Sequence, residues 1–238
     1  MFLALNKAVT LLGSAPVVLP VSGALAAVLW RRHSAKAAVG WGVALASMVA
    51  VVVLLKIAGH ACNVHLFDDR LTSPSGHAAL SAAVYGAVGV VVARHVEGWR
   101  RNAFLLAVFG VVAGVAVSRV ILRSHSVTEV TVGLALGGLA VAAFALGLAR
   151  IVRTQAAEAE GAAGGALSPA PAGGRRWPSS PLVVAPLLAA AVLLLGTGAA
   201  TFGSRSTVEP TLKRIATLLR QDDVLCGPVQ SPGAIPPR

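Results

Sequence analysis

Residues 72–77 read Thr72-Ser73-Pro74-Ser75-Gly76-His77, and this short polar stretch opens a long apolar segment. Ser73 is a good helix N-cap, and Pro74 suits the first helical position because its missing N–H is not needed there. Gly76 lets the backbone approach a ligand closely. The N–H groups of the first turn then point at one spot, with the positive end of the helix dipole behind them. This geometry binds an anion such as phosphate, and His77 adds a proton donor beside it.

A second polar stretch contains Ser118-Arg119, then His125, then Glu129. His125 and Glu129 are four residues apart and share a helix face, where a carboxylate fixes the imidazole tautomer and stabilises its charged form. That arrangement activates a histidine nucleophile. Arg119 and His125 would not share a face of one unbroken helix. A turn around Leu122–Ser124 would let Arg119 end one helix and clamp a phosphate that His125 attacks.

The two stretches together resemble a known family. P-S-G-H at 74–77, followed by S-R-x5-H-x3-acid at 118–129, resembles the type 2 phosphatidic acid phosphatase (PAP2) superfamily of membrane-bound histidine phosphatases. The specific motifs fall within Lys56–Gly138. The rest of the chain matches only as a generic multi-helix membrane chain.

This sequence departs from the family pattern at two places. The third motif of the family usually ends in Asp, and here it ends in Glu129. The first motif of the family is K-x6-R-P, and here Lys56 is followed at positions 63 and 64 by Asn63-Val64. Either Arg70 supplies the missing guanidinium from a different place, or one phosphate clamp is absent.

The resemblance implies a two-step phosphoryl transfer through phosphohistidine. His125 would attack phosphorus, with Glu129 orienting it, and His77 would protonate the leaving oxygen and then help to activate water. No metal or other cofactor is expected, because positive side chains neutralise the phosphate. The residues expected to bind the substrate phosphate are Arg119, Lys56, Ser75, Gly76 and Arg70.

The expected substrate is a lipid phosphate, because a site at bilayer depth admits an amphiphile laterally. Undecaprenyl diphosphate, phosphatidic acid and phosphatidylglycerol phosphate all suit such an enzyme. One alternative is a catalytically weak or inactive relative that binds lipid phosphates, which the missing Arg-Pro would support. Another is a small transporter, which would predict inverted repeats and helices broken at mid-membrane. The sequence shows no convincing repeat, and its charges lie at helix ends.

Composition predicts an all-α, polytopic membrane helix bundle. The chain has 238 residues, of which 56% are hydrophobic and 12% charged, and a soluble domain would be far more charged. About six stretches approach the 20 residues or so that span a bilayer. They are Ala8–Trp30, Ala37–Ala58, His77–Ala93, Phe104–Leu122, Val127–Val152 and Leu182–Phe202. They define a transmembrane domain over residues 1–203 with a disordered inner linker at 154–180. A tail over 204–238 contains a short amphipathic helix at Pro210–Gln221.

The net charge of +11 reports topology rather than nucleic-acid binding, since the basic residues do not form a stripe interleaved with aromatics. The loops after the first, third and fifth expected helices hold ten of them: Arg31, Arg32, Lys36, Arg94, Arg100, Arg101, Arg150, Arg153, Arg175 and Arg176. By the positive-inside rule these loops are cytoplasmic. In a bacterial-type inner (plasma) membrane, the motif loops and both termini would then face outward. Basic residues in the C-terminal tail weaken this assignment.

The loop Gly59–Thr72 is dense in groups that could bind zinc, including His60, Cys62 and His65. The spacing H-x-C-x2-H is not a standard zinc pattern, so a solvated loop at the mouth of the site is the preferred interpretation. Cys62 and Cys226 would lie on the same, oxidising side of the membrane. They are either two free thiols or a disulfide that pins the tail over this loop.

Overall fold

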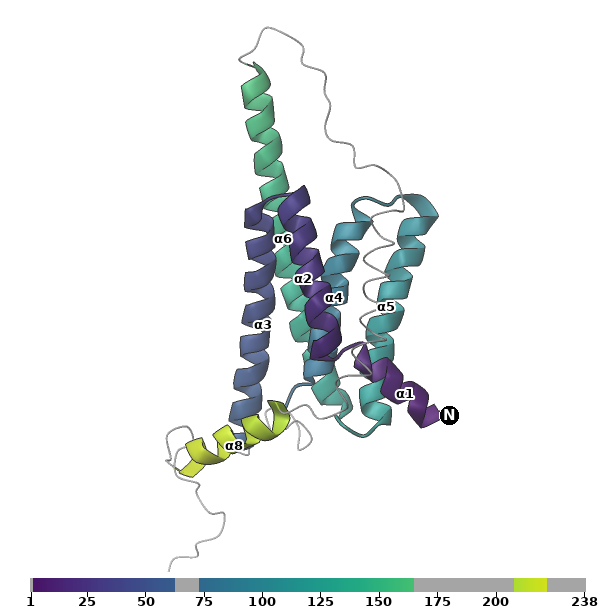
Figure 1. Ribbon diagram of the computed structural model, residues 1–238, viewed down its shortest axis with the longest axis vertical. Helices are drawn as coiled ribbons and strands as arrows, with labels where there is room; N and C mark the ends of the chain where they lie inside the picture. Colours follow the sequence, from purple (N-terminus) through teal and green to yellow (C-terminus); the bar gives the residue numbers. More distant parts are fainter. Residues whose placement is uncertain (1, 63–72, 165–207, 222–238) are drawn as a thin grey trace, which may run out of the picture.

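The computed structural model describes residues 2–62, 73–164 and 208–221, and within these ranges all regular structure is helical and no strand occurs (Figure 1). The all-α prediction is therefore confirmed. The helices are α1 (Phe2–Leu11), α2 (Ala15–Arg32), α3 (Ala35–Cys62), α4 (Gly76–Ala93), α5 (Gly98–Ile121), α6 (Val127–Gly164) and α8 (Val208–Gln221).

Five segments of the described chain are long and apolar enough to cross a membrane: Phe2–Arg32, Ala35–His60, Gly76–Ala93, Gly98–Ile121 and Val127–Glu158. They correspond to the first five predicted spans. The sixth predicted span, Leu182–Phe202, lies outside the described residues. Large apolar side chains such as Leu106, Phe109 and Leu139 are exposed on the outer surface, where lipid would cover them.

The first span is two helices rather than one. α1 ends at Leu11 and α2 begins at Ala15, with short turn hydrogen bonds between them. Pro16 lies in the first turn of α2, where a missing N–H costs nothing, and Pro20 lies inside α2 without ending it. The interruption is therefore N-terminal to both prolines.

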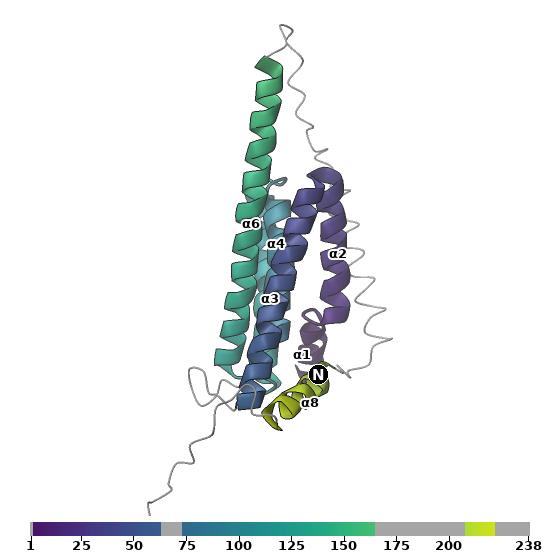
Figure 2. The ribbon, with the colours of Figure 1, turned by 90° about the vertical axis from the view of Figure 1, so that its left-hand side faces the viewer.

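Two other helices extend further than their apolar sequence predicts. α3 continues to Cys62, and α6 continues past Val152 to Gly164. Residues 154–164 of the predicted linker are therefore helical, because alanine and glutamate in this stretch are good helix formers. Figure 2 shows this end of α6 projecting beyond the other helices. Residues 165–180 of the predicted linker lie outside the described residues.

The long helices run side by side along the long axis of the molecule, and α4 lies among α2, α3, α5 and α6 (Figures 1 and 2). α4 is rich in fully buried small residues, including Ala79, Ala83 and Val84. Beside it, the Trp41 and Phe144 rings pack edge to face with centroids 5.3 Å apart. α4 is therefore the helix around which the bundle is built.

α8 lies across the end of the bundle where α3 ends (Figure 1). Leu212 and Ala216, four residues apart, are buried, whereas Ile215 and Leu218 are exposed. The helix expected at Pro210–Gln221 is present and begins two residues earlier, at Val208. Its predicted position on the outer leaflet stays a prediction.

The contact between α4 and α6 depends on two glycines. A Cβ atom at Gly133 would lie 2.5 Å from the Ser75 carbonyl oxygen, and one at Gly137 would lie 2.5 Å from the Ala79 carbonyl oxygen. Both are far inside van der Waals contact, so a side chain at either position would push the helices apart. Close approach through small residues is the usual way in which membrane helices associate. Gly138, by contrast, faces open space.

Gly137→Ala should therefore destabilise the bundle by roughly 1–3 kcal/mol, the usual cost of overpacking. Gly138→Ala is the matched control, because nothing lies within 4 Å of its new methyl group. Thermal unfolding of the two variants in the same detergent measures the difference. Equal melting temperatures for Gly137→Ala and Gly138→Ala would contradict the packing described for α4 and α6.

Candidate active site

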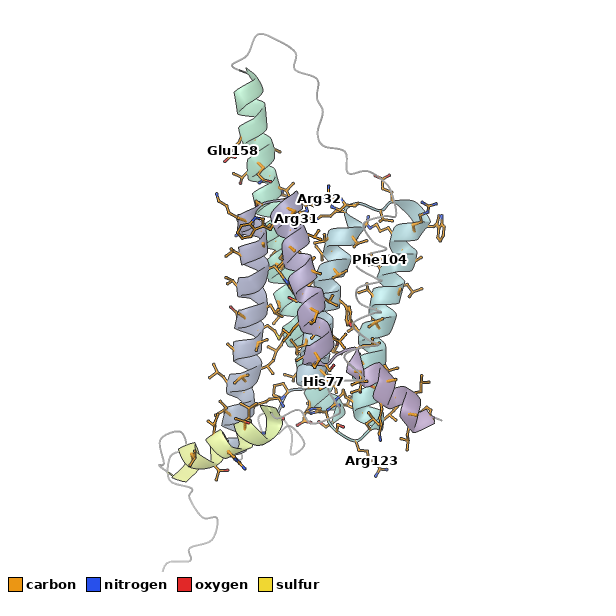
Figure 3. All side chains as sticks on the ribbon, viewed as in Figure 1. Arg31, Arg32, His77, Phe104, Arg123 and Glu158 are labelled. Atoms are coloured by element: carbon orange, nitrogen blue, oxygen red, sulfur yellow. The ribbon has the colours of Figure 1, made fainter. Side chains whose placement is uncertain are left out.

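The two polar motifs meet at one end of the bundle. α4 and α6 begin there, and α5 ends there. Figure 3 shows His77 and Arg123 at this end, and Arg31 and Arg32 at the opposite end. The residues that sequence analysis selected for phosphate chemistry are thus separated, by the length of the bundle, from the arginines assigned to the cytoplasm.

Glu129 joins the motifs to each other. Its side chain is buried, and its Oε1 atom accepts a hydrogen bond of 2.9 Å from the Ser73 N–H. Its Oε2 atom accepts one of 3.1 Å from the Ser126 N–H and lies 2.9 Å from Nδ1 of His125. Its backbone carbonyl accepts a bond of 3.0 Å from the Ser75 N–H. One residue therefore fixes the segment before α4 and the segment before α6.

The start of α6 is a capping box. The Ser126 Oγ atom accepts a hydrogen bond of 3.2 Å from the Glu129 N–H, while the Glu129 carboxylate accepts from the Ser126 N–H. This reciprocal pairing satisfies two N–H groups of a helix start. His125 and Glu129 are in contact, as expected, but His125 precedes the helix instead of lying on it. The role of Ser126 was not predicted, although the spacing S-x-x-E at 126–129 is a signal that could have identified it.

The predicted turn at Leu122–Ser124 is present. α5 ends at Ile121, and the N–H groups of Ser124 and His125 donate to the Arg119 carbonyl over 3.1 and 3.4 Å. Arg123 takes a left-handed backbone conformation, with φ of 51°. Its side chain is exposed and points away from the bundle (Figure 3). Of the two arginines in this motif, Arg119 is therefore the one available to the site.

The environment of His125 favours its neutral form. Burial lowers the pKa of His125, and the positive charges of Arg119 and Lys56 lower it further. The hydrogen bond and the charge of Glu129 oppose this shift without reversing it. Since Nδ1 is engaged with Glu129, Nε2 is the ring nitrogen that can act on a ligand. A neutral imidazole beside two cations is suited to attack an anionic phosphorus centre.

The start of α4 differs from the prediction. The N-cap is Ser75, whose Oγ accepts from the Ala78 N–H over 3.5 Å, and the helix begins at Gly76. The assignment of Ser73 as N-cap, with Pro74 in the first helical position, was wrong. The reason is Glu129, because its bonds to the N–H groups of Ser73 and Ser75 keep residues 73–75 outside the helix. His77 lies in the first turn of α4 and is half-buried.

Lys56 also differs from its predicted setting. It was expected at a helix end, but α3 continues for six further residues and leaves Lys56 only 6% exposed. Its positive charge lowers the pKa of His125. Arg70, His65 and Cys226 lie outside the described residues, so the alternative guanidinium and the disulfide stay predictions.

Among the residues that the structure describes, no three His, Cys, Asp or Glu side chains are grouped as metal ligands would be.

Residues 58–153 match the family model described as PAP2 superfamily. A curated relative, an uncharacterized 22.5 kDa protein in the cps region of Klebsiella pneumoniae, is 31% identical over 138 residues. That alignment covers 57% of this chain and 66% of the relative, so slightly less than two thirds of the relative's length is spanned. No solved structure matches the chain. The resemblance to the PAP2 superfamily is thus confirmed, and with five apolar helices it indicates a multi-pass membrane protein.

The charges around His125 predict the direction in which its pKa changes when Glu129 is replaced. Glu129→Gln removes the carboxylate charge that raises the His125 pKa and weakens the hydrogen bond that also raises it, so this pKa should fall below its wild-type value. In the wild type, the pKa of His125 should already lie below the ordinary histidine value of 6.5. Nuclear magnetic resonance titration of ring-labelled histidine measures both quantities.

Glu158→Gln is the control, because Glu158 is exposed near the far end of α6 (Figure 3). It should leave the His125 titration unchanged. A rise of the His125 pKa in Glu129→Gln would show that the contact between the two side chains does not act as described.

The lowered pKa of His125 also predicts how the stability of the protein depends on pH. Folded His125 binds its proton more weakly than the unfolded chain does, so the free energy of unfolding should decrease as the pH falls below 6.5.

Proposed function

We propose that this protein is an integral-membrane phosphatase that hydrolyses a lipid phosphate or diphosphate through a phosphohistidine on His125. The observation that carries the proposal is the 2.9 Å contact between His125 Nδ1 and Glu129, beside the charges of Arg119 and Lys56. A carboxylate on one ring nitrogen, with cations acting on the same ring, is an arrangement that suits a histidine nucleophile.

The proposed reaction has two balanced steps. In the first, His125 Nε2 forms a bond to the terminal phosphorus and the P–O bond to the leaving group breaks, which is an ester bond in a monophosphate and an anhydride bond in a diphosphate. His77 donates a proton to the leaving oxygen. In the second, His77 accepts a proton from water as that water attacks phosphorus. The N–P bond then breaks and inorganic phosphate leaves. Glu129 stabilises the positive charge that the His125 ring gains in the first step.

The substrate phosphate would be bound where positive side chains and the positive end of a helix dipole already lie. The N–H groups of Gly76 and His77 at the start of α4 supply donors and the positive helix end, and Ser75 lies beside them. Arg119 and Lys56 would neutralise the equatorial oxygens, and Arg70 is proposed as a further clamp. Such fixed, partly buried charges give most of the rate gain in phosphoryl transfer. No metal ion is needed for this scheme.

The proposed substrate is a lipid, of the undecaprenyl diphosphate or phosphatidic acid class. The site lies at the end of helices that span the apolar layer, so an amphiphile would reach it from the bilayer. The proposed orientation is outward, with both termini outside a bacterial-type inner membrane. The clustering of Arg31 and Arg32 at the opposite end from His77 supports this orientation (Figure 3).

Phosphate release from a short-chain phosphatidic acid and from a polyprenyl diphosphate, with EDTA present, tests the proposal. The purified wild type should release phosphate in EDTA. His125→Ala should lose at least about 1,000-fold in rate, as expected for loss of a nucleophile. Arg119→Ala should lose roughly 100- to 1,000-fold, comparable to the loss of one transition-state donor.

Arg123→Gln is the matched control, because this exposed arginine of the same motif points away from the site. It should retain wild-type activity. If folded wild-type protein releases no phosphate from either lipid but binds lipid phosphates, the protein is a binding relative. The Asn63-Val64 sequence, in place of Arg-Pro, then becomes the reason for the missing activity.

A further inference from the structure

The interruption of the first span, Leu12-Gly13-Ser14, lies against the candidate active site. α1 packs on α5, and α2 packs on α4, so the residues between them reach both helices that carry polar motifs. Such a break leaves backbone carbonyl groups without helical partners, which is costly in a buried position unless they are bonded. Tyr85 of α4 satisfies one of these groups, because its hydroxyl donates to the Leu12 carbonyl over 2.8 Å.

Gly13 is in direct contact with the backbone of His77. A Cβ atom at Gly13 would lie 2.9 Å from the His77 carbonyl oxygen and 2.7 Å from Cγ1 of Val115. Real Cβ atoms do not approach other atoms so closely, and Val115 is fully buried, so it has no free space to move into. Only glycine therefore permits this packing at position 13.

The last turn of α1, directly before the break, is bonded to the end of α5. Thr10 Oγ1 and Ser118 Oγ are 2.6 Å apart and share a hydrogen bond. Ser118 is fully buried and immediately precedes Arg119. Thr10 thus contacts α5 beside the candidate phosphate clamp, and Leu12 is bonded to Tyr85 of α4. Gly13 contacts both α5, at Val115, and the backbone of His77, the candidate general acid.

We propose that the break between α1 and α2 is a positioning element for the active site, and that Gly13 sets the place of His77. This inference rests on the proposed function, because it assigns Gly13 an effect through the general acid. Gly13 itself touches no substrate. Because Gly13 has no side chain, its backbone can pack directly against the His77 carbonyl. This contact fixes the position of the first turn of α4 relative to Arg119.

Gly13→Ala tests the proposal, with Gly23→Ala on α2 as the matched control because nothing lies within 4 Å of its new methyl group. A side chain at position 13 should displace His77 by a fraction of an ångström to an ångström. This should lower kcat by roughly 10- to 100-fold, since reacting groups tolerate little misplacement. KM should change little, and the pH dependence of kcat should shift. Gly23→Ala should match the wild type in all three.

A second variant keeps the proposal testable if Gly13→Ala does not fold. Tyr85→Phe removes the hydrogen bond to Leu12 without adding atoms, so it should lower kcat in the same direction by a smaller factor. Folding of each variant is checked by size-exclusion chromatography and thermal unfolding. The proposal is wrong if Gly13→Ala folds and keeps the wild-type kcat and pH profile. If Gly13→Ala does not fold, the proposal is wrong if Tyr85→Phe keeps the wild-type kcat and pH profile.

A readout independent of catalysis separates this inference from the proposed function. The rate at which diethyl pyrocarbonate modifies His77, measured by mass spectrometry of its peptide, should differ between Gly13→Ala and Gly23→Ala. If the wild type releases no phosphate yet this difference is present, the proposed function fails and the positioning effect stands. Equal modification rates in the two glycine variants would overturn the positioning effect.

Discussion

The buried Glu129 carboxylate is the constraint on which the site depends. A carboxylate removed from water is costly unless its oxygens are hydrogen-bonded, and here the N–H groups of Ser73 and Ser126 and the His125 ring fill them. Hydrogen bonds to a charged group contribute about 1.5–3 kcal/mol each, roughly twice the value of neutral ones. The same bonds fix the start of α6, keep residues 73–75 outside the helix and orient the imidazole. Satisfying one buried charge therefore builds most of the site.

Two positive helix ends and two cationic side chains gather around that residue. α4 and α6 both begin at this end of the bundle, so the positive ends of their dipoles face the same region. Arg119 and Lys56 add full charges that already act on His125. The glycines of α6 and the interruption after α1 bring the helices close enough for these groups to converge. The arrangement favours an anion before any ligand is present, which is what preorganisation requires.

Sequence analysis predicted the features that depend on local pattern. The apolar stretches gave the all-α bundle, and the spacing of Arg119, His125 and Glu129 gave the turn and the contact between histidine and carboxylate. It placed the N-cap at Ser73 instead of Ser75, because the competing bonds come from Glu129, which is distant in sequence. It missed Gly13 for the same reason: a lone glycine in an apolar span carries no local sign that it touches His77. Lys56 was placed at a helix end because apolarity alone does not mark where α3 stops.

Trapping the covalent intermediate tests the central claim most directly. Wild-type protein turning over a short-chain lipid phosphate would be quenched at alkaline pH and digested, and its peptides analysed for phosphohistidine by mass spectrometry. Phosphate should be found on His125, strongly reduced in Glu129→Gln and absent in His125→Ala. Turnover by the wild type with no phosphate on His125, or with phosphate on another residue, would contradict the assignment of His125 as the nucleophile oriented by Glu129.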